Sequence, residues 1–167
     1  MTFENLLAAN GRAPEIPEAA DVYGWLIGSW DLDVHRYAGA EVAFEGEVHF
    51  GWVLEGRAGQ DVWIMPRERG QLGKTNNMFG TTLRVWDASI AAWRIIWVKP
   101  VTMHREEQIG RWSGLDVMQI GARSDGTPTR WSYTEITADS FHWLGEALQT
   151  DGKTWRLEGE FRARRKG

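Results

Sequence analysis

Residues 28–35 read Gly-Ser-Trp-Asp-Leu-Asp-Val-His, and this stretch decides the fold. Its apolar residues, Trp30, Leu32 and Val34, alternate with two aspartates and a histidine. Successive side chains of a strand point to opposite faces, so this alternation predicts a strand with one buried and one wet face. The stretch is therefore interpreted as the first strand of a β-barrel.

The segment before this strand is predicted to be short and mostly irregular. Residues 2–9 favour one or two helical turns, and a Gly/Pro-containing linker over 10–17 is expected to pack loosely outside the barrel. Apolar residues at helical spacing over 17–27 predict a short amphipathic helix that leads into the strand. We therefore divide the chain into an N-terminal extension, 1–20, and a barrel domain, 21–167.

The rest of the chain is a series of strand patterns separated by turns. A long strand is predicted over 42–54, where apolar side chains recur at even positions. Further strands are predicted over 60–65, 78–86, 93–98, 103–112, 115–122, 130–137, 140–147 and 154–164. About ten antiparallel strands in a meander predict an all-β, up-and-down barrel, because closure removes the unpaired edges. Closure also creates an interior.

One glycine-rich run resembles a phosphate-binding loop without satisfying its pattern. Residues 70–75 read Gly-Gln-Leu-Gly-Lys-Thr, but Glu68 stands where the pattern requires glycine, and no helix is predicted to follow. We therefore expect no nucleotide site here.

Composition excludes several classes of function. The 167 residues suffice for one domain, and the net charge of -4 argues against nucleic acid or an anionic membrane as a partner. With no cysteine, the chain has no disulfide, thiolate nucleophile or cysteine metal site. No segment is apolar for long enough to cross a membrane as a helix. We expect a cytoplasmic protein.

The chain is unusually rich in tryptophan, with 11 residues, and this content allows two interpretations. The rings fill a barrel core, or they line a cavity for a hydrophobic or aromatic small molecule. Strand parity predicts a cavity lined by Trp52, Trp63, Trp97, Trp131, Tyr133 and Trp143. Aromatic side chains near strand ends also allow a third interpretation, a homodimeric interaction module that binds no ligand.

Five polar residues share strand parity with large apolar neighbours and are predicted to face the interior: Asp61, Arg105, Glu107, Gln119 and Glu135. One interpretation is that they satisfy one another inside the barrel. In another, Arg105 grips a ligand carboxylate or carbonyl through its planar guanidinium, with Gln119 and Glu135 also lining the site.

An enzymatic alternative uses the same side chains. Glu135, set among aromatic residues, would act as acid or base in an isomerase- or cyclase-type proton transfer, with Arg105 and Asp61 as further catalytic candidates. The sequence has no Ser/His/Asp arrangement and no histidine spacing typical of a metal site. We therefore expect no metal.

The helix-then-Gly-x-Trp opening, carried by Gly28, Ser29 and Trp30, resembles the lipocalin and wider calycin barrels. The resemblance implies that Trp30 plugs the closed end, with Arg162 or Arg164 from the last strand stacked over it. Phrases such as Phe-Gly-Trp-Val-Leu-Glu-Gly-Arg at 50–57 are similar to a bacterial group of lipocalin-like proteins.

The same opening and strand number also resemble the haem-carrying nitrobindin-type barrels. That resemblance implies a proximal histidine. The four candidates are His35, His49, His104 and His142, of which parity places most on the outer face. We expect no cofactor and keep haem as the alternative.

Overall fold

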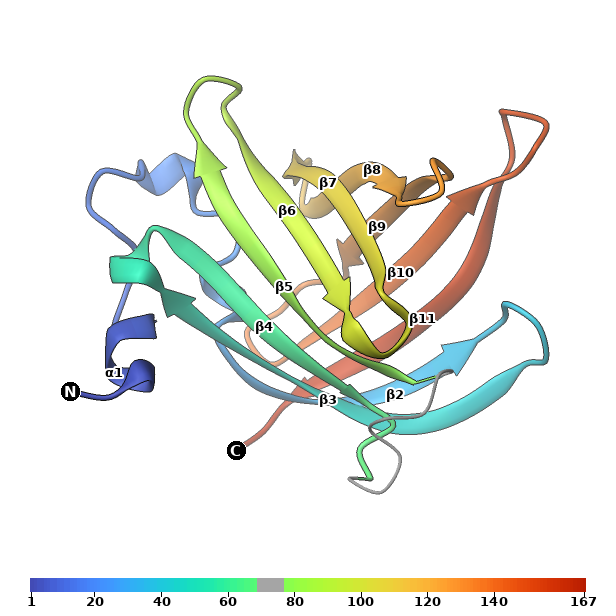
Figure 1. Ribbon diagram of the computed structural model, residues 1–167, viewed down its shortest axis with the longest axis horizontal. Coiled ribbons are helices and arrows are strands. Elements are labelled where there is room, and N and C mark those ends of the chain that lie inside the picture. The colour runs from blue at the N-terminus through green and yellow to red at the C-terminus, as the bar shows by residue number, and fades with distance from the viewer. Residues whose placement is uncertain (69–76) are drawn as a thin grey trace.

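The computed structural model describes residues 1–68 and 77–167, so the glycine-rich run at 70–75 lies outside the described residues. Helix α1 (Phe3–Leu7) and the two-residue strand β1 (Ala8–Ala9) come first. The barrel strands then follow in chain order (Figure 1): β2 (Gly28–Arg36), β3 (Val42–Val53), β4 (Ala58–Met65), β5 (Met78–Asp87), β6 (Ala92–Lys99), β7 (His104–Ser113), β8 (Asp116–Arg123), β9 (Pro128–Thr134), β10 (Ser140–Leu148) and β11 (Trp155–Arg165). Among the described residues, no helix combines the length and apolarity needed to cross a membrane.

Each barrel strand pairs antiparallel with its neighbours in the chain, and the circle closes where β11 pairs with β2. Leu32 lies opposite Ala163 at this junction, and Trp30 lies opposite Arg165. Among the described residues, each of the ten barrel strands therefore pairs with two other barrel strands, which leaves no open sheet edge in the barrel wall. The predicted fold, an all-β up-and-down antiparallel barrel with a short N-terminal helix, is confirmed.

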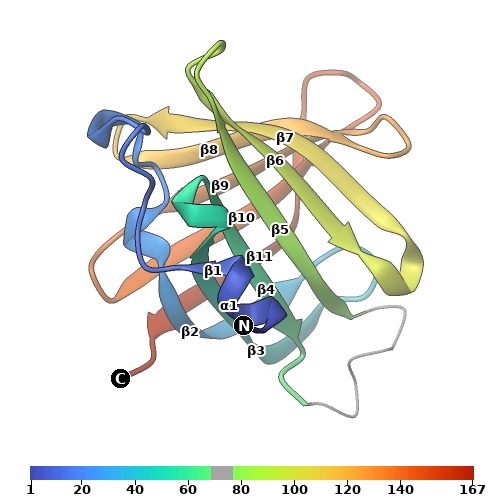
Figure 2. The ribbon, with the colours of Figure 1, turned by 60° about the vertical axis from the view of Figure 1, so that its left-hand side comes forward.

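The N-terminal segment covers one end of the barrel (Figure 2). Where an amphipathic α-helix was predicted, the chain forms two 3-10 turns, η1 (Glu18–Ala20) and η2 (Gly24–Leu26). Asp21 separates them, because its Oδ1 accepts a hydrogen bond from the Gly24 N–H at 2.7 Å. The expected loose packing of residues 10–17 is wrong, since Ala13 and Ile16 are 2% and 3% exposed within the core.

Trp30 closes the same end from inside. Its side chain is fully buried, and its indole N–H donates to the Leu26 carbonyl at 2.9 Å. The Arg165 guanidinium lies over the indole, with Cζ 4.1 Å from the ring centroid. Arg165 also donates to the Trp25 and Ile27 carbonyls, at 2.8 Å each. Arginine over tryptophan and charged donors on backbone carbonyls fix the plug to the wall.

The stacking partner differs from the expected Arg162 or Arg164. Those side chains are 63% and 78% exposed, because they alternate with the inward Phe161 and Ala163 and so point to solvent. The arginine that stacks on Trp30 is Arg165, and the residue beside it must be glycine, here Gly28. Its φ of +129° suits glycine, and a Cβ there would lie 2.6 Å from Arg165 Nη1.

Candidate functional site

The half of the interior next to the N-terminal segment is filled by a polar network around Arg84 of β5. The Arg84 side chain is fully buried, and its Nη1 donates to Asp61 Oδ2 at 2.8 Å. Nη2 donates to the Tyr133 hydroxyl at 2.9 Å, and Nε to Gln119 Oε1 at 3.3 Å. The guanidinium also packs 4.5 Å from the Phe50 ring centroid. Every nitrogen of this buried cation therefore has a protein acceptor.

The network continues through three further side chains, those of Tyr23, Gln108 and Thr129. Gln119 Oε1 also accepts from the Tyr23 hydroxyl at 2.9 Å, and its amide donates to Gln108 at 3.0 Å. Gln108 in turn donates to the Thr129 hydroxyl at 3.1 Å. Gln119 and Tyr133, which were expected to line the ligand site, and Asp61, a catalytic candidate, are thus engaged with protein groups. Their partners are Arg84, Tyr23 and Gln108 rather than other members of the predicted interior set.

The network makes stability dependent on alkaline pH. Burial raises the pKa of Tyr133 to about 12 from its ordinary 10.0, and burial also raises the pKa of Tyr23. Unfolded chains release these protons first, so we expect the free energy of unfolding to fall mainly between pH 10 and 12, by about 3 kcal/mol in all for Tyr133. Urea unfolding at several pH values measures this slope. Tyr133→Phe should reduce the slope, with Tyr23 accounting for what remains, and an unchanged slope in that variant would contradict the assignment.

Three other predicted interior residues lie outside. Strand β7 begins at His104, after Met103, whose backbone is left-handed with φ of +54°. Glu106 pairs with the buried Trp97 and faces the interior, so Arg105 and Glu107 face solvent, one position out of phase with the prediction. Glu135 also leaves the strand alternation, with φ of +51°, and pairs on the surface with Arg162 at 2.8 Å. The expected catalytic set of Glu135, Arg105 and Asp61 is therefore not brought together.

Sequence reasoning missed Arg84 and Glu106, both of which face the interior. Arg84 shares parity with the buried Thr82, a signal that strand alternation on β5 contains. Glu106 is only 5% exposed and pairs in register with Trp97 of β6. Aligning β7 with β6 so that Trp97 lies opposite position 106 would have identified Glu106 as an interior residue.

Four of the five tryptophans predicted to line the cavity meet in one cluster in the middle of the barrel. Trp63 lies at its centre, with ring centroids 4.9, 5.4 and 5.3 Å from those of Trp97, Trp131 and Trp143. Trp143 stacks on Phe161, at 4.8 Å and an interplanar angle of 9°. Trp52 is separate, since it packs against Trp93 near the covered end. Of the six expected cavity residues, three line the cavity described next.

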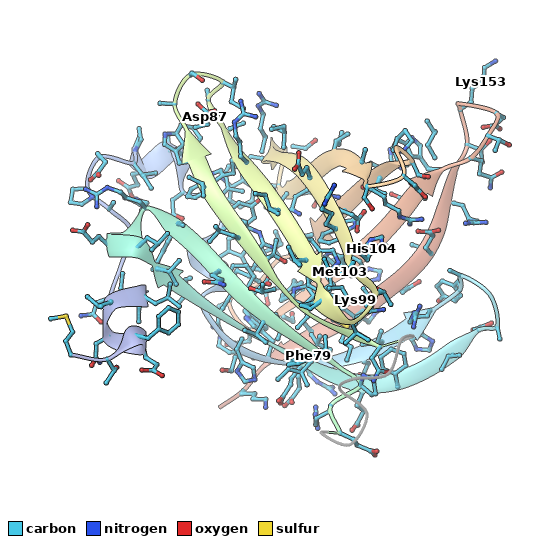
Figure 3. All side chains as sticks on the ribbon, in the orientation of Figure 1. Phe79, Asp87, Lys99, Met103, His104 and Lys153 are labelled. Carbon is cyan, nitrogen blue, oxygen red and sulfur yellow. The ribbon has the colours of Figure 1, made fainter. Side chains whose placement is uncertain are left out.

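A cavity of about 260 Å³ lies at the barrel mouth, opposite the covered end. Its apolar wall is formed by Trp97, Trp131 and Trp143, and its polar lining includes Glu106 and His104. The connections β2–β3, β6–β7, β8–β9 and β10–β11 gather around this mouth (Figure 1). Figure 3 shows Lys99 and His104 beside each other where β6 gives way to β7. The site therefore combines aromatic rings below with charged groups at the rim.

An irregularity in β11 shapes the rim. Glu158 is an extra residue there, because Gly159 pairs with Gly145 whereas Leu157 pairs with Glu146. The Glu158 carboxylate contacts Arg123, which ends β8 across the mouth. This ion pair spans the rim between strands that do not neighbour each other in the sheet.

The cationic side of the rim comes from β2 and β6. Arg36 and Lys99 both line the cavity. Burial, together with the charge of Arg36, lowers the pKa of Lys99 below its usual value. The rim thus has positive groups facing a wall that contains Glu106.

The residues around the cavity do not fit a haem. Of the four histidines, only His104 lines it, and Nε2 of that ring is 3.4 Å from Glu106. His49 and His142 lie on the outer wall, where they contact Ser29 and Glu160. The volume of about 260 Å³ is below the roughly 300–1,000 Å³ typical of drug-sized ligands, and haem is larger than most of these. No group of three His, Asp or Glu in residues 1–68 and 77–167 is arranged to hold a metal ion.

Comparisons with protein-family models and with curated proteins found no match. Among solved structures, Rv2717c from M. tuberculosis is similar over 91% of this chain and 99% of its own, with a TM-score of 0.54 and 11% identity. A de novo designed fluorescence-activating β-barrel matches 87% of this chain and 98% of its own, with a TM-score of 0.38 and 12% identity. The first likeness shows a shared fold and nothing finer.

Proposed function

We propose that this barrel binds a small aromatic molecule in the cavity at its mouth. The observation that carries the proposal is the wall formed by Trp97, Trp131 and Trp143 beside a cavity of about 260 Å³. Flat rings offer stacking and edge contacts to a planar ligand without requiring a particular polar group. The opposite half of the interior is filled by its own side chains, so binding is confined to the mouth.

The cavity size limits the ligand to one or two fused rings, smaller than most drug-sized molecules. We therefore expect a dissociation constant of about 0.1–1 mM for a plain bicyclic probe, within the usual affinity per ligand atom. Membership of the lipocalin-like group, a cytoplasmic location and a homodimer stay predictions.

A blocking substitution at the mouth tests this proposal. Ala38 lines the cavity from the exposed β2–β3 connection, so Ala38→Trp should fill the mouth without disturbing the core. Titration calorimetry with quinoline, which has no N–H group, should show at least tenfold weaker binding in this variant. Ala40→Trp, two residues further along the same exposed connection, should bind like the wild type.

Equal binding of quinoline by wild type and Ala38→Trp would contradict the site, and no binding by the wild type would contradict the function. Native mass spectrometry of the protein purified from its own host should show a retained aromatic molecule. The absorption spectrum should lack a Soret band, since the cavity does not fit haem. A Soret band would overturn this part of the proposal.

A further inference from the structure

Glu106 is a buried carboxyl group in the wall of the mouth cavity. It lies on the inner face of β7, opposite Trp97 of β6 and Arg123 of β8 in the strand register. Its side chain is 6% exposed, and it lines the cavity together with those two residues. A carboxyl group is rarely buried so deeply without partners that satisfy its oxygens.

The two oxygens of Glu106 have different surroundings. Oε2 is 3.4 Å from His104 Nε2. Oε1 is buried and has no hydrogen-bond partner among the described residues. The nearest cationic atom, Arg123 Nε, is 3.9 Å from it, which is too far for a hydrogen bond, and the same guanidinium contacts Glu158. An acceptor is thus left open beside the tryptophan rings of the cavity wall.

A buried acceptor without a hydrogen bond raises the free energy of the empty cavity, and a hydrogen-bond donor on a ligand would remove this cost on binding. We propose that Glu106 is the polar anchor of the cavity and accepts a hydrogen bond from a neutral N–H or O–H group on the aromatic ligand. The inference rests on the proposed function and specifies its ligand class. The expected ligand is a planar ring whose N–H or O–H group lies in or next to the plane of the ring. The ring contacts Trp97, and the N–H or O–H group donates at the same time to the neighbouring Glu106 carboxyl group.

A neutral donor suits the cavity better than an ammonium group. Three cationic side chains, Arg36, Lys99 and Arg123, line the site together with three carboxylates, Glu106, Glu146 and Glu158. The formal charges of the lining therefore balance, and a ligand cation would add an unbalanced charge to the cavity. A neutral N–H group makes the charge-assisted hydrogen bond without adding a charge.

Two isomers distinguish binding through a hydrogen bond to Glu106 from binding through the shape of the cavity alone. The compounds 3-methylindole and 1-methylindole have the same size and rings, but only the first retains the N–H group. Calorimetry on the wild type should show about tenfold tighter binding of 3-methylindole, the range expected for one hydrogen bond to a charged acceptor. Equal affinities, or tighter binding of 1-methylindole, would overturn the inference.

Substitutions of Glu106 test whether this side chain causes the preference for 3-methylindole over 1-methylindole. Glu106→Met should bind the two isomers equally, because it keeps the length of the side chain and removes the acceptor oxygens. Glu106→Gln, which keeps one neutral oxygen and nearly the same shape, should reduce the preference to about threefold, since neutral acceptors bind more weakly. A preference unchanged in a folded Glu106→Gln protein would also overturn the inference.

The matched control is Glu107→Met on the same strand. Glu107 faces solvent and does not line the cavity, so the preference for 3-methylindole should stay near tenfold. If both isomers bind equally and Ala38→Trp weakens both, the anchor is wrong but the aromatic site stands. If neither isomer nor quinoline binds, the proposed function itself fails.

Discussion

Replacing Arg84 with methionine should lower the free energy of unfolding by about 3–5 kcal/mol, the range for breaking a buried ion pair from one side. Arg84 and Asp61 are both fully buried and 2.8 Å apart. Burial opposes the charge of Arg84, but attraction to Tyr133 and Asp61 outweighs it, so the pKa of Arg84 lies above its ordinary value. Methionine fills similar space but leaves the Asp61 charge without a counterion. Urea unfolding at neutral pH measures the change.

A double-substitution cycle separates the ion pair from packing. Asp61→Asn retains the oxygen that accepts the Thr82 N–H and removes the charge. The Arg84→Met and Asp61→Asn double variant should therefore be more stable than the sum of the single losses by more than 1 kcal/mol, roughly the coupling of neighbouring residues. Strict additivity would contradict a paired role. Arg94→Met, at an exposed pair with Asp87, should change stability by less than about 1 kcal/mol.

The second large effect is expected at the plug, where Arg165→Ala should lower the free energy of unfolding by about 2–4 kcal/mol. The cation–π contact with Trp30 accounts for about 0.5–2 kcal/mol of this. The rest comes from the carbonyls of Trp25, Ile27 and Ala138, which lose their charged donor. Thermal and urea unfolding give the magnitude.

Lysine at position 165 should restore less than half of the loss, because an ammonium group cannot stack and donate to several carbonyls in one plane. Arg164→Ala is the neighbouring control. Its side chain is 78% exposed, so the expected change is within about 0.5 kcal/mol. Similar losses for Arg164→Ala and Arg165→Ala would show that the guanidinium is not what fixes the plug.

The barrel could be predicted because side-chain alternation survives along most strands. Trp30, Leu32 and Val34 are all buried as the parity of β2 required. The same rule selects Arg165 as the plug partner, since it shares parity with Phe161 and Ala163, whereas the resemblance suggested Arg162 or Arg164. Alternation was the better guide wherever a strand had no irregularity.

The candidate site was harder to predict because three of its strands depart from regular alternation. On β7 the inner face carries Glu106 and Gln108, while the apolar Ile109 lies on the other face, so hydropathy indicates the wrong phase. The left-handed residues Met103 and Glu135 shift or end strands at positions no residue pattern marked. The extra residue at Glu158 places a third acidic group at the mouth.

The junction between β2 and β11 determines when this protein is able to fold. Trp30 pairs with Arg165, so the barrel circle cannot close until β11 has been synthesised. A nascent chain that has made only β2 to β10 leaves one open edge on β2 and one on β10, and such edges are templates for intermolecular pairing. Closure between such distant segments also makes the contacts non-local, which slows folding. On the ribosome, the last strand therefore controls both folding time and exposure to aggregation.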